Sequence, residues 1–156
     1  MATKQHITYL SKRGMKELKK AITRLERRKS QIIANLRDLD KTDTHEQRLE
    51  RVEKLAQLEI TESELADKQL ILGTAKLYPR KRDALKVAMG SVVDLIDTQG
   101  RMVRYQLVNS VEADPSDGRI SVKSPLGAEL IGKTIRDTVE WSHGLRVQRL
   151  QLVSIT

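Results

Sequence analysis

Basic side chains crowd the stretch from Lys12 to Lys29, where nine Lys or Arg residues stand against two Glu residues. Contact with nucleic-acid phosphates is the chemistry that such a run can perform, and it is electrostatic and salt-sensitive. A solvated helix face is the ordinary explanation of a charge run. A coiled coil, however, usually intersperses acids for cross-pairing, and their scarcity favours phosphate binding. The candidate contacts are Lys16, Lys19, Lys20, Arg24, Arg27 and Arg28.

Acidic residues gather instead in LDKTDTHEQR, residues 39–48. Asp43 and Glu46 are three residues apart, which is the spacing of a helix N-cap and its N3 partner. Thr44 and Gln47 form a second capping box one position later. The residues therefore predict the start of a helix here, and they leave a further role for the two carboxylates open. Asp38 and Asp40 are further candidate acids whose ordinary explanation is a solvated helix surface, and His45 is expected to be exposed to solvent.

Two long helical segments must position these residues. No Gly or Pro lies between Gly14 and Gly73, and good helix formers fill the interval. One stripe with coiled-coil spacing, broken at Lys29, contains Leu18, Ile22, Leu25, Ile32, Leu36 and Leu39. A less regular second stripe contains Leu49, Val52, Ala56, Leu58, Leu65 and Leu72. We expect an antiparallel hairpin over residues 1–76 with its tip near 39–46. A continuous helix that forms a dimer is the alternative.

The pattern changes after Gly73 to a linker at 77–84 and a small α+β domain at 85–156. Alternating apolar residues predict strands at 91–97, 101–108, 119–124 and 145–155. Residues 126–134 predict a short helix that ends at Gly132. Tyr105 and Trp141 lie within strand-like segments and are expected in the core. The fold class is therefore α+β, with an N-terminal helical hairpin followed by a sheet domain.

Composition limits the possible functions. The formal charge of +8 and the pI near 9.8 favour a polyanionic partner. The chain has no Cys, no apolar run of membrane-spanning length and no apolar core of a secretory signal, so we expect a cytoplasmic protein. It also lacks a Gly-rich phosphate loop and a metalloprotease motif, so an autonomous enzyme is not expected. Three Tyr and one Trp are too few for a base-stacking platform.

Two segments resemble the Gre transcript-cleavage factors. YLSKRGMKELKKAITRLE, residues 9–26, is similar to the opening of that family, and ISVKSPLGAELIGKT, residues 120–134, is similar to its C-terminal signature. The matching positions are Tyr9, Leu10, Ser11, Gly14, Leu18 and Leu25 in the first segment, and Ile120, Ser121, Val122, Ser124, Pro125, Leu130, Ile131, Gly132 and Lys133 in the second. Both segments agree with the family in order and separation, so the resemblance covers essentially the whole chain.

The resemblance implies an N-terminal coiled-coil hairpin and an FKBP-like C-terminal domain that docks on bacterial RNA polymerase beside its secondary channel. It implies that tip acids, here Asp43 and Glu46, help to hold a second Mg²⁺ in the polymerase active site for cleavage of the 3′ end of backtracked RNA. The implied factor is a monomer with no enzymatic activity or cofactor of its own. The basic face would contact RNA, and Ser124 and Pro125 would lie near the polymerase contact. Without the resemblance, this pair is explained by a strand-to-helix turn with Ser124 as the cap and Pro125 at the first helical position.

The tip departs from the family pattern. The family's flanking Gly, Leu, Asn and Tyr are absent, and alignment from the Ile32-Ile33 pair puts Thr44 and Gln47 where the family has its acids. Two alternatives to a cleavage factor therefore stay open. One is a Gre-like protein that enters the channel and inhibits or modulates the polymerase without cleavage. The other is a basic coiled-coil module that binds nucleic acid or protein unaided.

Overall fold

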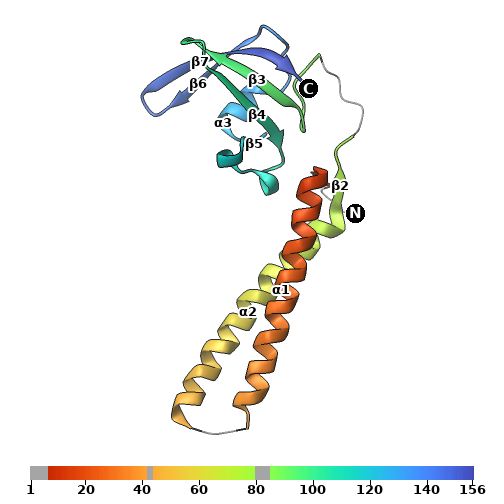
Figure 1. Ribbon diagram of the computed structural model, residues 1–156, viewed down its shortest axis with the longest axis vertical. Helices are drawn as coiled ribbons and strands as arrows, with labels where there is room; N and C mark the ends of the chain where they lie inside the picture. Colours follow the sequence, from red (N-terminus) through yellow and green to blue (C-terminus); the bar gives the residue numbers. More distant parts are fainter. Residues whose placement is uncertain (1–6, 42–43, 80–84) are drawn as a thin grey trace, which may run out of the picture. The chain divides into compact units, whose positions relative to one another are not determined.

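The computed structural model describes residues 7–41, 44–79 and 85–156. The chain divides into two compact units: one holds Lys12–Ala75, and the other holds Tyr9–Ser11 together with Lys76–Thr156. The helices are α1 (Lys12–Leu39), α2 (His45–Thr74) and α3 (Pro125–Leu130). The strands are β1 (Thr8–Leu10), β2 (Ala75–Leu77), β3 (Val92–Asp97), β4 (Met102–Val108), β5 (Arg119–Ser121), β6 (Thr138–His143) and β7 (Arg146–Ile155) (Figure 1). No helix in the described ranges combines the length and the apolar character needed to cross a lipid bilayer.

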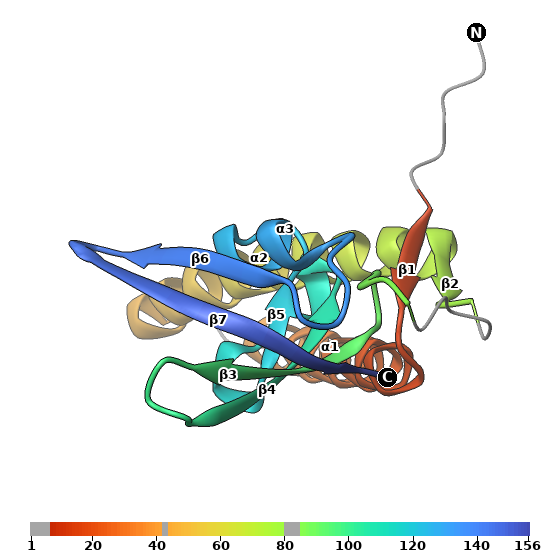
Figure 2. The ribbon, with the colours of Figure 1, turned by 90° about the horizontal axis from the view of Figure 1, so that it is seen from above.

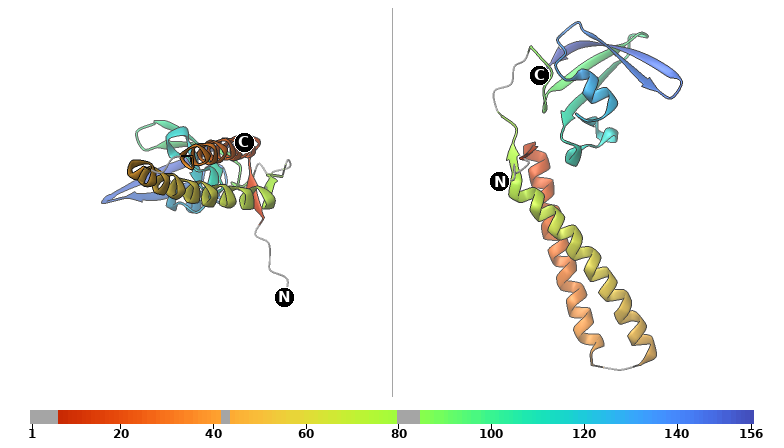
Figure 3. Two further views of the ribbon diagram at one scale, coloured as in Figure 1. Left: turned by 90° about the horizontal axis from the view of Figure 1, so that it is seen from below. Right: turned by 180° about the vertical axis from the view of Figure 1, so that it is seen from behind.

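The first unit is an antiparallel hairpin in which α1 and α2 lie side by side (Figures 1 and 3). The predicted stripe of α1 is confirmed, because Leu18, Ile22, Leu25 and Ile32 are all buried. The polar gap in this stripe is filled by an ion pair, in which Lys29 Nζ lies 2.9 Å from Glu62 Oε1 on α2. The hairpin, and not the continuous helix, is therefore the observed arrangement.

The predicted stripe of α2 is only partly right. Leu65 is buried and Leu58 is half-buried, but Leu49 and Val52 are 61% and 66% exposed and Ala56 is exposed too. Leu58, Leu65 and Leu72 define the side of α2 that packs on α1. Thr61 lies on the same side, between Leu58 and Leu65. Thr61 is fully buried because its hydroxyl donates to the Gln57 carbonyl at 2.7 Å. The apolar residues near the start of α2 belong to another face.

The second unit is built on a five-stranded sheet with the order β5-β4-β3-β7-β6 (Figure 2). Its pairs are antiparallel except β4 with β5, which are parallel. All four strands predicted with bounds are present, although β5 ends at Ser121. Trp141, expected in a strand-like segment, lies in β6. Alternate residues of the central strands fill a core with α3, formed by Val87, Val93, Leu95, Leu107, Ile120, Leu126, Leu130, Val139, Leu150 and Leu152. Tyr105 and Trp141 pack against this core, as expected.

Helix α3 is shorter than predicted, and its start is fixed by local chemistry. Ser124 caps it by accepting the Gly127 N–H at 3.1 Å, and Pro125 occupies the first turn. A Cβ on Gly127 would overlap the backbone carbonyl oxygen of Ser121, so this position requires glycine. Gly132 follows the helix with φ +80°, a left-handed conformation that glycine adopts without strain.

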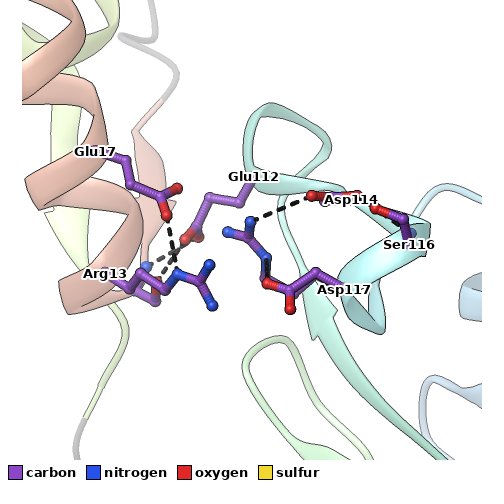
Figure 4. A network of polar contacts seen from close by, with 8 residues as sticks. Arg13, Glu17, Glu112, Asp114, Ser116 and Asp117 are labelled. Atoms are coloured by element: carbon purple, nitrogen blue, oxygen red, sulfur yellow. Dashed lines mark hydrogen bonds and ion pairs between the residues drawn. The ribbon is translucent and has the colours of Figure 1, made fainter.

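A buried carboxylate connects distant segments of the second unit. Glu112, which is labelled in Figure 4, is 6% exposed. Its carboxylate accepts hydrogen bonds from the Ser11 backbone N–H at 2.9 Å, from the Ser11 hydroxyl and from the Tyr78 hydroxyl at 3.0 Å. The same Tyr78 oxygen accepts the Asn109 N–H at 3.0 Å. Tyr78 lies inside the stretch predicted as a linker at 77–84, yet it is buried. The last residues of that stretch lie outside the described ranges.

On the other face of the sheet, Asp94 joins three strands. Its carboxylate accepts two hydrogen bonds from Arg104, at 2.7 and 3.0 Å, and one from Ser154 at 2.7 Å. The bonds from Arg104, then that from Ser154, lower the pKa of Asp94 to about 2. This cluster contributes stability only while the carboxyl group is ionised.

Candidate functional site on the helical hairpin

The outward side of α1 forms a hollow of about 760 Å³ along the helix. Its lining residues recur at steps of three and four, which is why they share one face. That face is opposite the buried seam, because the seam residues repeat with the same period about half a turn away. The hollow is lined by Lys12, Met15, Lys16, Lys19, Lys20, Thr23, Arg24 and Arg27.

Five of the six predicted phosphate contacts line this hollow, and Arg28 lies outside it. All six are exposed. Within the described ranges none of the six forms an ion pair, whereas Arg13 is paired with Glu17 at 2.9 Å and Lys29 with Glu62. Met15 and Thr23 were not among the predicted contacts, although their spacing from Lys12 places them on the same face. The arrangement can hold a polyanion along about 22 Å of helix, at 1.5 Å per residue from Lys12 to Arg27.

The described part of the tip shows how α2 begins. Thr44 is the N-cap: its hydroxyl accepts the Gln47 N–H at 3.3 Å, and the Gln47 side-chain oxygen accepts the Thr44 N–H at 3.2 Å. The capping box predicted at this pair is therefore confirmed. Glu46 is exposed in the first turn. Asp43, the other predicted tip acid, lies outside the described residues.

Other acids close to the tip are engaged. Asp38 pairs with Lys41 at 2.9 Å, and Asp40 at the end of α1 pairs with Arg51 on α2. Glu46, by contrast, forms no ion pair with any residue that the structure describes. His45 is exposed. The described residues contain no cluster of three or more His, Asp or Glu side chains able to hold a metal ion by themselves.

These observations define what the tip can do. Mg²⁺ is commonly held by one or two protein carboxylates while it keeps waters and substrate oxygens. A projecting carboxylate such as Glu46 can complete a metal site that another protein supplies, but the described part of the tip does not assemble one alone. Sequence reasoning did not find the pairing of Asp40 with Arg51, because no fixed spacing links residues on two helices.

The predicted docking residues have defined local roles. Ser124 is half-buried and accepts the Gly127 N–H, so its hydroxyl serves the start of α3. Pro125 is exposed at the first helical turn, beside the exposed Lys123. The capping interpretation of this pair is confirmed, and a contact with another protein stays a prediction.

Comparison with known proteins agrees with the resemblance seen in the sequence. The family model described as "Transcription elongation factor, GreA/GreB, C-term" matches residues 82–156. The transcription elongation factor GreA of Chlorobium phaeobacteroides is 34% identical over 138 residues, which cover 85% of this chain and 86% of that protein. The protein of the same name from Chloroherpeton thalassium is 32% identical over 153 residues, covering 95% and 96%.

Solved structures of similar chains carry related descriptions. A GreA/GreB elongation factor from Nitrosomonas europaea is 26% identical, with a TM-score of 0.45 over 59% of this chain and 78% of that one. The GreA factor homolog 1 of Thermus thermophilus is 21% identical, with a TM-score of 0.43 over 96% and 98%. With relatives of more than 30% identity matched over most of their length, this chain belongs to the GreA/GreB family of transcription elongation factors.

Proposed function

We propose that this chain binds bacterial RNA polymerase at its secondary channel and stimulates cleavage of the 3′ end of backtracked RNA. The observation that supports the proposal is that the residues that cap α2 at the tip are different from the acidic residue exposed there. Thr44 and Gln47 cap α2, so the exposed carboxylate of Glu46 is not needed to start the helix. The chain is then an accessory factor of the polymerase nuclease and acts as a monomer.

The tip carboxylates of Asp43 and Glu46 would be shared ligands of Mg²⁺ in the polymerase active site, where the ion supplies an activated water and charge stabilisation for phosphodiester cleavage. The pairing of Asp38 and Asp40 with Lys41 and Arg51 supports this assignment. Those two acids already have partners, which leaves Glu46 as a better candidate for a new cation. Such a shared site needs no cofactor bound to the isolated chain.

The basic hollow of α1 would hold the extruded RNA. Its exposed Lys and Arg side chains lack ion-pair partners among the described residues, so phosphates need not displace an existing pair. Contacts with a single strand should make log Kd depend on log salt with a slope of about 0.7 per phosphate. The C-terminal unit would dock through the exposed segment around Pro125, with Ser124 holding the turn that presents it.

The test is cleavage of 3′-labelled RNA in a backtracked complex of the cognate polymerase. We expect the wild-type chain to release short 3′ fragments and Asp43→Asn/Glu46→Gln to release none, although both bind the polymerase. Asp38→Asn is the matched control, because it removes a nearby carboxylate that already pairs with Lys41. Cleavage by the double variant at the wild-type rate would refute the tip assignment.

Two other results would replace the proposed function. If neither the wild-type chain nor the double variant stimulates cleavage, but both slow elongation, the chain is a modulator that occupies the channel. Salt-dependent binding to free RNA, together with no binding to the polymerase, would make it an independent basic coiled-coil module.

A further inference from the structure

Helix α2 carries an apolar stripe on its exposed side. Leu49, Val52, Ile60 and Leu70 are 61%, 66%, 58% and 71% exposed, and Ala56 is exposed between them. The steps of three and four from Leu49 to Ile60 place them on one face. Continuous steps of three and four cover only Leu49 to Ile60, about 16 Å or three helical turns. Leu70 lies on the same side ten residues further along, beyond the polar Ser63 and Asp67.

This stripe is separate from the seam with α1. The buried residues of α2 are Thr61 and Leu65, and Leu49 is rotated from Leu65 by roughly 160° at 100° per residue. Helix α2 therefore has apolar residues on two opposite sides, of which α1 covers one. Exposed apolar residues aligned along one helix face over about three turns usually mark a surface that another molecule covers.

Beyond its first turn, where Arg48 and Arg51 are exposed, the border of the stripe is acidic. Glu53, Glu59, Glu64 and Asp67 are all exposed, whereas Lys54, the one cation between Val52 and Asp67, is half-buried. The outer side of α2 thus combines apolar residues with acids along its middle turns. Charge complementarity requires a partner with Lys or Arg beside its own apolar residues.

A second copy of this chain does not meet that requirement. Two α2 stripes would bring acids against acids, which is unfavourable at flanking positions of paired helices. The outward face of α1 in a second copy is basic, but the hollow along it has only Met15 as a large apolar residue. A basic amphipathic helix of another protein fits both features. The hairpin already contains one such contact, between Lys29 of α1 and Glu62 of α2.

We propose that the stripe formed by Leu49, Val52, Ala56, Ile60 and Leu70 docks on a basic amphipathic helix of the partner protein. This inference rests on the proposed function, under which that protein is RNA polymerase. The stripe adds a second, apolar contact to the hairpin, on a different helix from the one that carries the basic hollow.

Affinity for the cognate polymerase core enzyme tests this inference. Val52→Ser/Ile60→Ser/Leu70→Ser should weaken binding by on the order of tenfold, since central apolar contacts carry much of the affinity of an interface. Because all three side chains are exposed, the circular dichroism melting curve of the hairpin should change little. The matched control is Leu85→Ser/Leu145→Ser, which removes residues of 73% and 106% exposure elsewhere in the chain and should bind like wild type.

Charge is tested separately with Glu53→Gln/Glu59→Gln/Asp67→Asn, which should weaken binding and flatten its salt dependence. A photoreactive benzoylphenylalanine at Ile60 should then crosslink to a polymerase segment with Lys or Arg beside apolar residues. Unchanged affinity of the serine variant, or a crosslinked product that is a dimer of this chain, would overturn the inference. If cleavage persists, either of these two results overturns only the docking inference and leaves the proposed function in place. Failure of the wild-type chain to bind polymerase would overturn both the inference and the proposed function.

Discussion

Removal of the Glu112 carboxylate should sharply destabilise the C-terminal unit. The carboxylate is 6% exposed and accepts three hydrogen bonds, two from Ser11 and one from Tyr78. Glu112→Ala leaves these donors unpaired in a buried place, and each unsatisfied buried group costs about 1–3 kcal/mol. We therefore expect the free energy of unfolding to fall by about 3–5 kcal/mol. That is a large part of the stability of a small domain.

Glu112→Gln keeps the shape of the side chain and replaces its carboxyl group with an uncharged amide. The amide keeps one acceptor oxygen, and its NH₂ group can donate to the Ser11 hydroxyl after that hydroxyl rotates. The loss should then be limited to charge assistance, about 1–2 kcal/mol. Tyr78→Phe should cost a similar amount, since it removes the donor to Glu112 and the acceptor of the Asn109 N–H.

The assay is urea unfolding followed by the fluorescence of Trp141, which is the only Trp in the chain and packs against the core of the same unit. A double-mutant cycle of Tyr78→Phe and Glu112→Gln should give a coupling of at least 0.5 kcal/mol, because the two side chains contact each other. A coupling near zero, or a loss below about 0.5 kcal/mol for Glu112→Ala, would show that water replaces the network and would refute the reasoning.

Three further predictions concern other elements. Thr44→Ala removes the cap that bonds Gln47 and should destabilise the hairpin by about 1 kcal/mol, seen as a lower melting temperature in circular dichroism. Asp94 has its folded pKa lowered to about 2, so it contributes stability above about pH 4 that is lost as the pH falls towards 2. Asp94→Asn should therefore cost on the order of 1 kcal/mol at pH 7, after allowance for solvent screening, and progressively less below pH 4 in urea titrations. Gly127→Ala should cost about 3 kcal/mol or more in the same titrations, because its Cβ would overlap the Ser121 carbonyl.

Each of these has a matched control. Ser63→Ala removes an exposed hydroxyl from the middle of α2 and should not lower the melting temperature. Glu129→Gln removes an exposed charge from the second unit and should show no comparable loss at pH 7. Gly73→Ala adds a Cβ within α2 that meets nothing within 4 Å, so it should be neutral or stabilising. Equal losses in a variant and its control would contradict the corresponding assignment.

The first helix could be predicted from sequence because its apolar residues form a single stripe. Leu18, Ile22, Leu25 and Ile32 form one seam, so only one side of α1 can pack on the partner helix. Lys29 interrupts this seam but does not create a second one. Helix α2 could not be predicted in the same way, since two apolar stripes share its length. Leu49 and Val52 fit a seam as well as Leu58 does until the partner helix is known.

The helix caps could also be predicted from the sequence, whereas contacts between distant segments could not. The pairs Thr44 with Gln47 and Ser124 with Gly127 follow fixed offsets along the chain, so the start of each helix could be predicted. The hydrogen bond between Ser11 and Glu112 joins residues 101 positions apart, and no fixed spacing in the sequence predicts such a contact. Strand β6 was indicated around Trp141 without bounds, because its extent depends on pairing with β7.

Charge on the hairpin is segregated by helix, which gives each outward face a different chemistry. The outward face of α1 is basic, and the outward face of α2 is acidic and apolar. An even mixture of signs would have let neighbouring side chains pair on each helix and would have neutralised both faces. Within α1, Arg13 pairs with Glu17, but neither residue lines the hollow. Pairing between the two helices occurs where they meet, between Lys29 and Glu62, and beside the tip, between Asp40 and Arg51. Under the proposed function, this separation lets one hairpin hold RNA on α1 and protein on α2 without competition between the two.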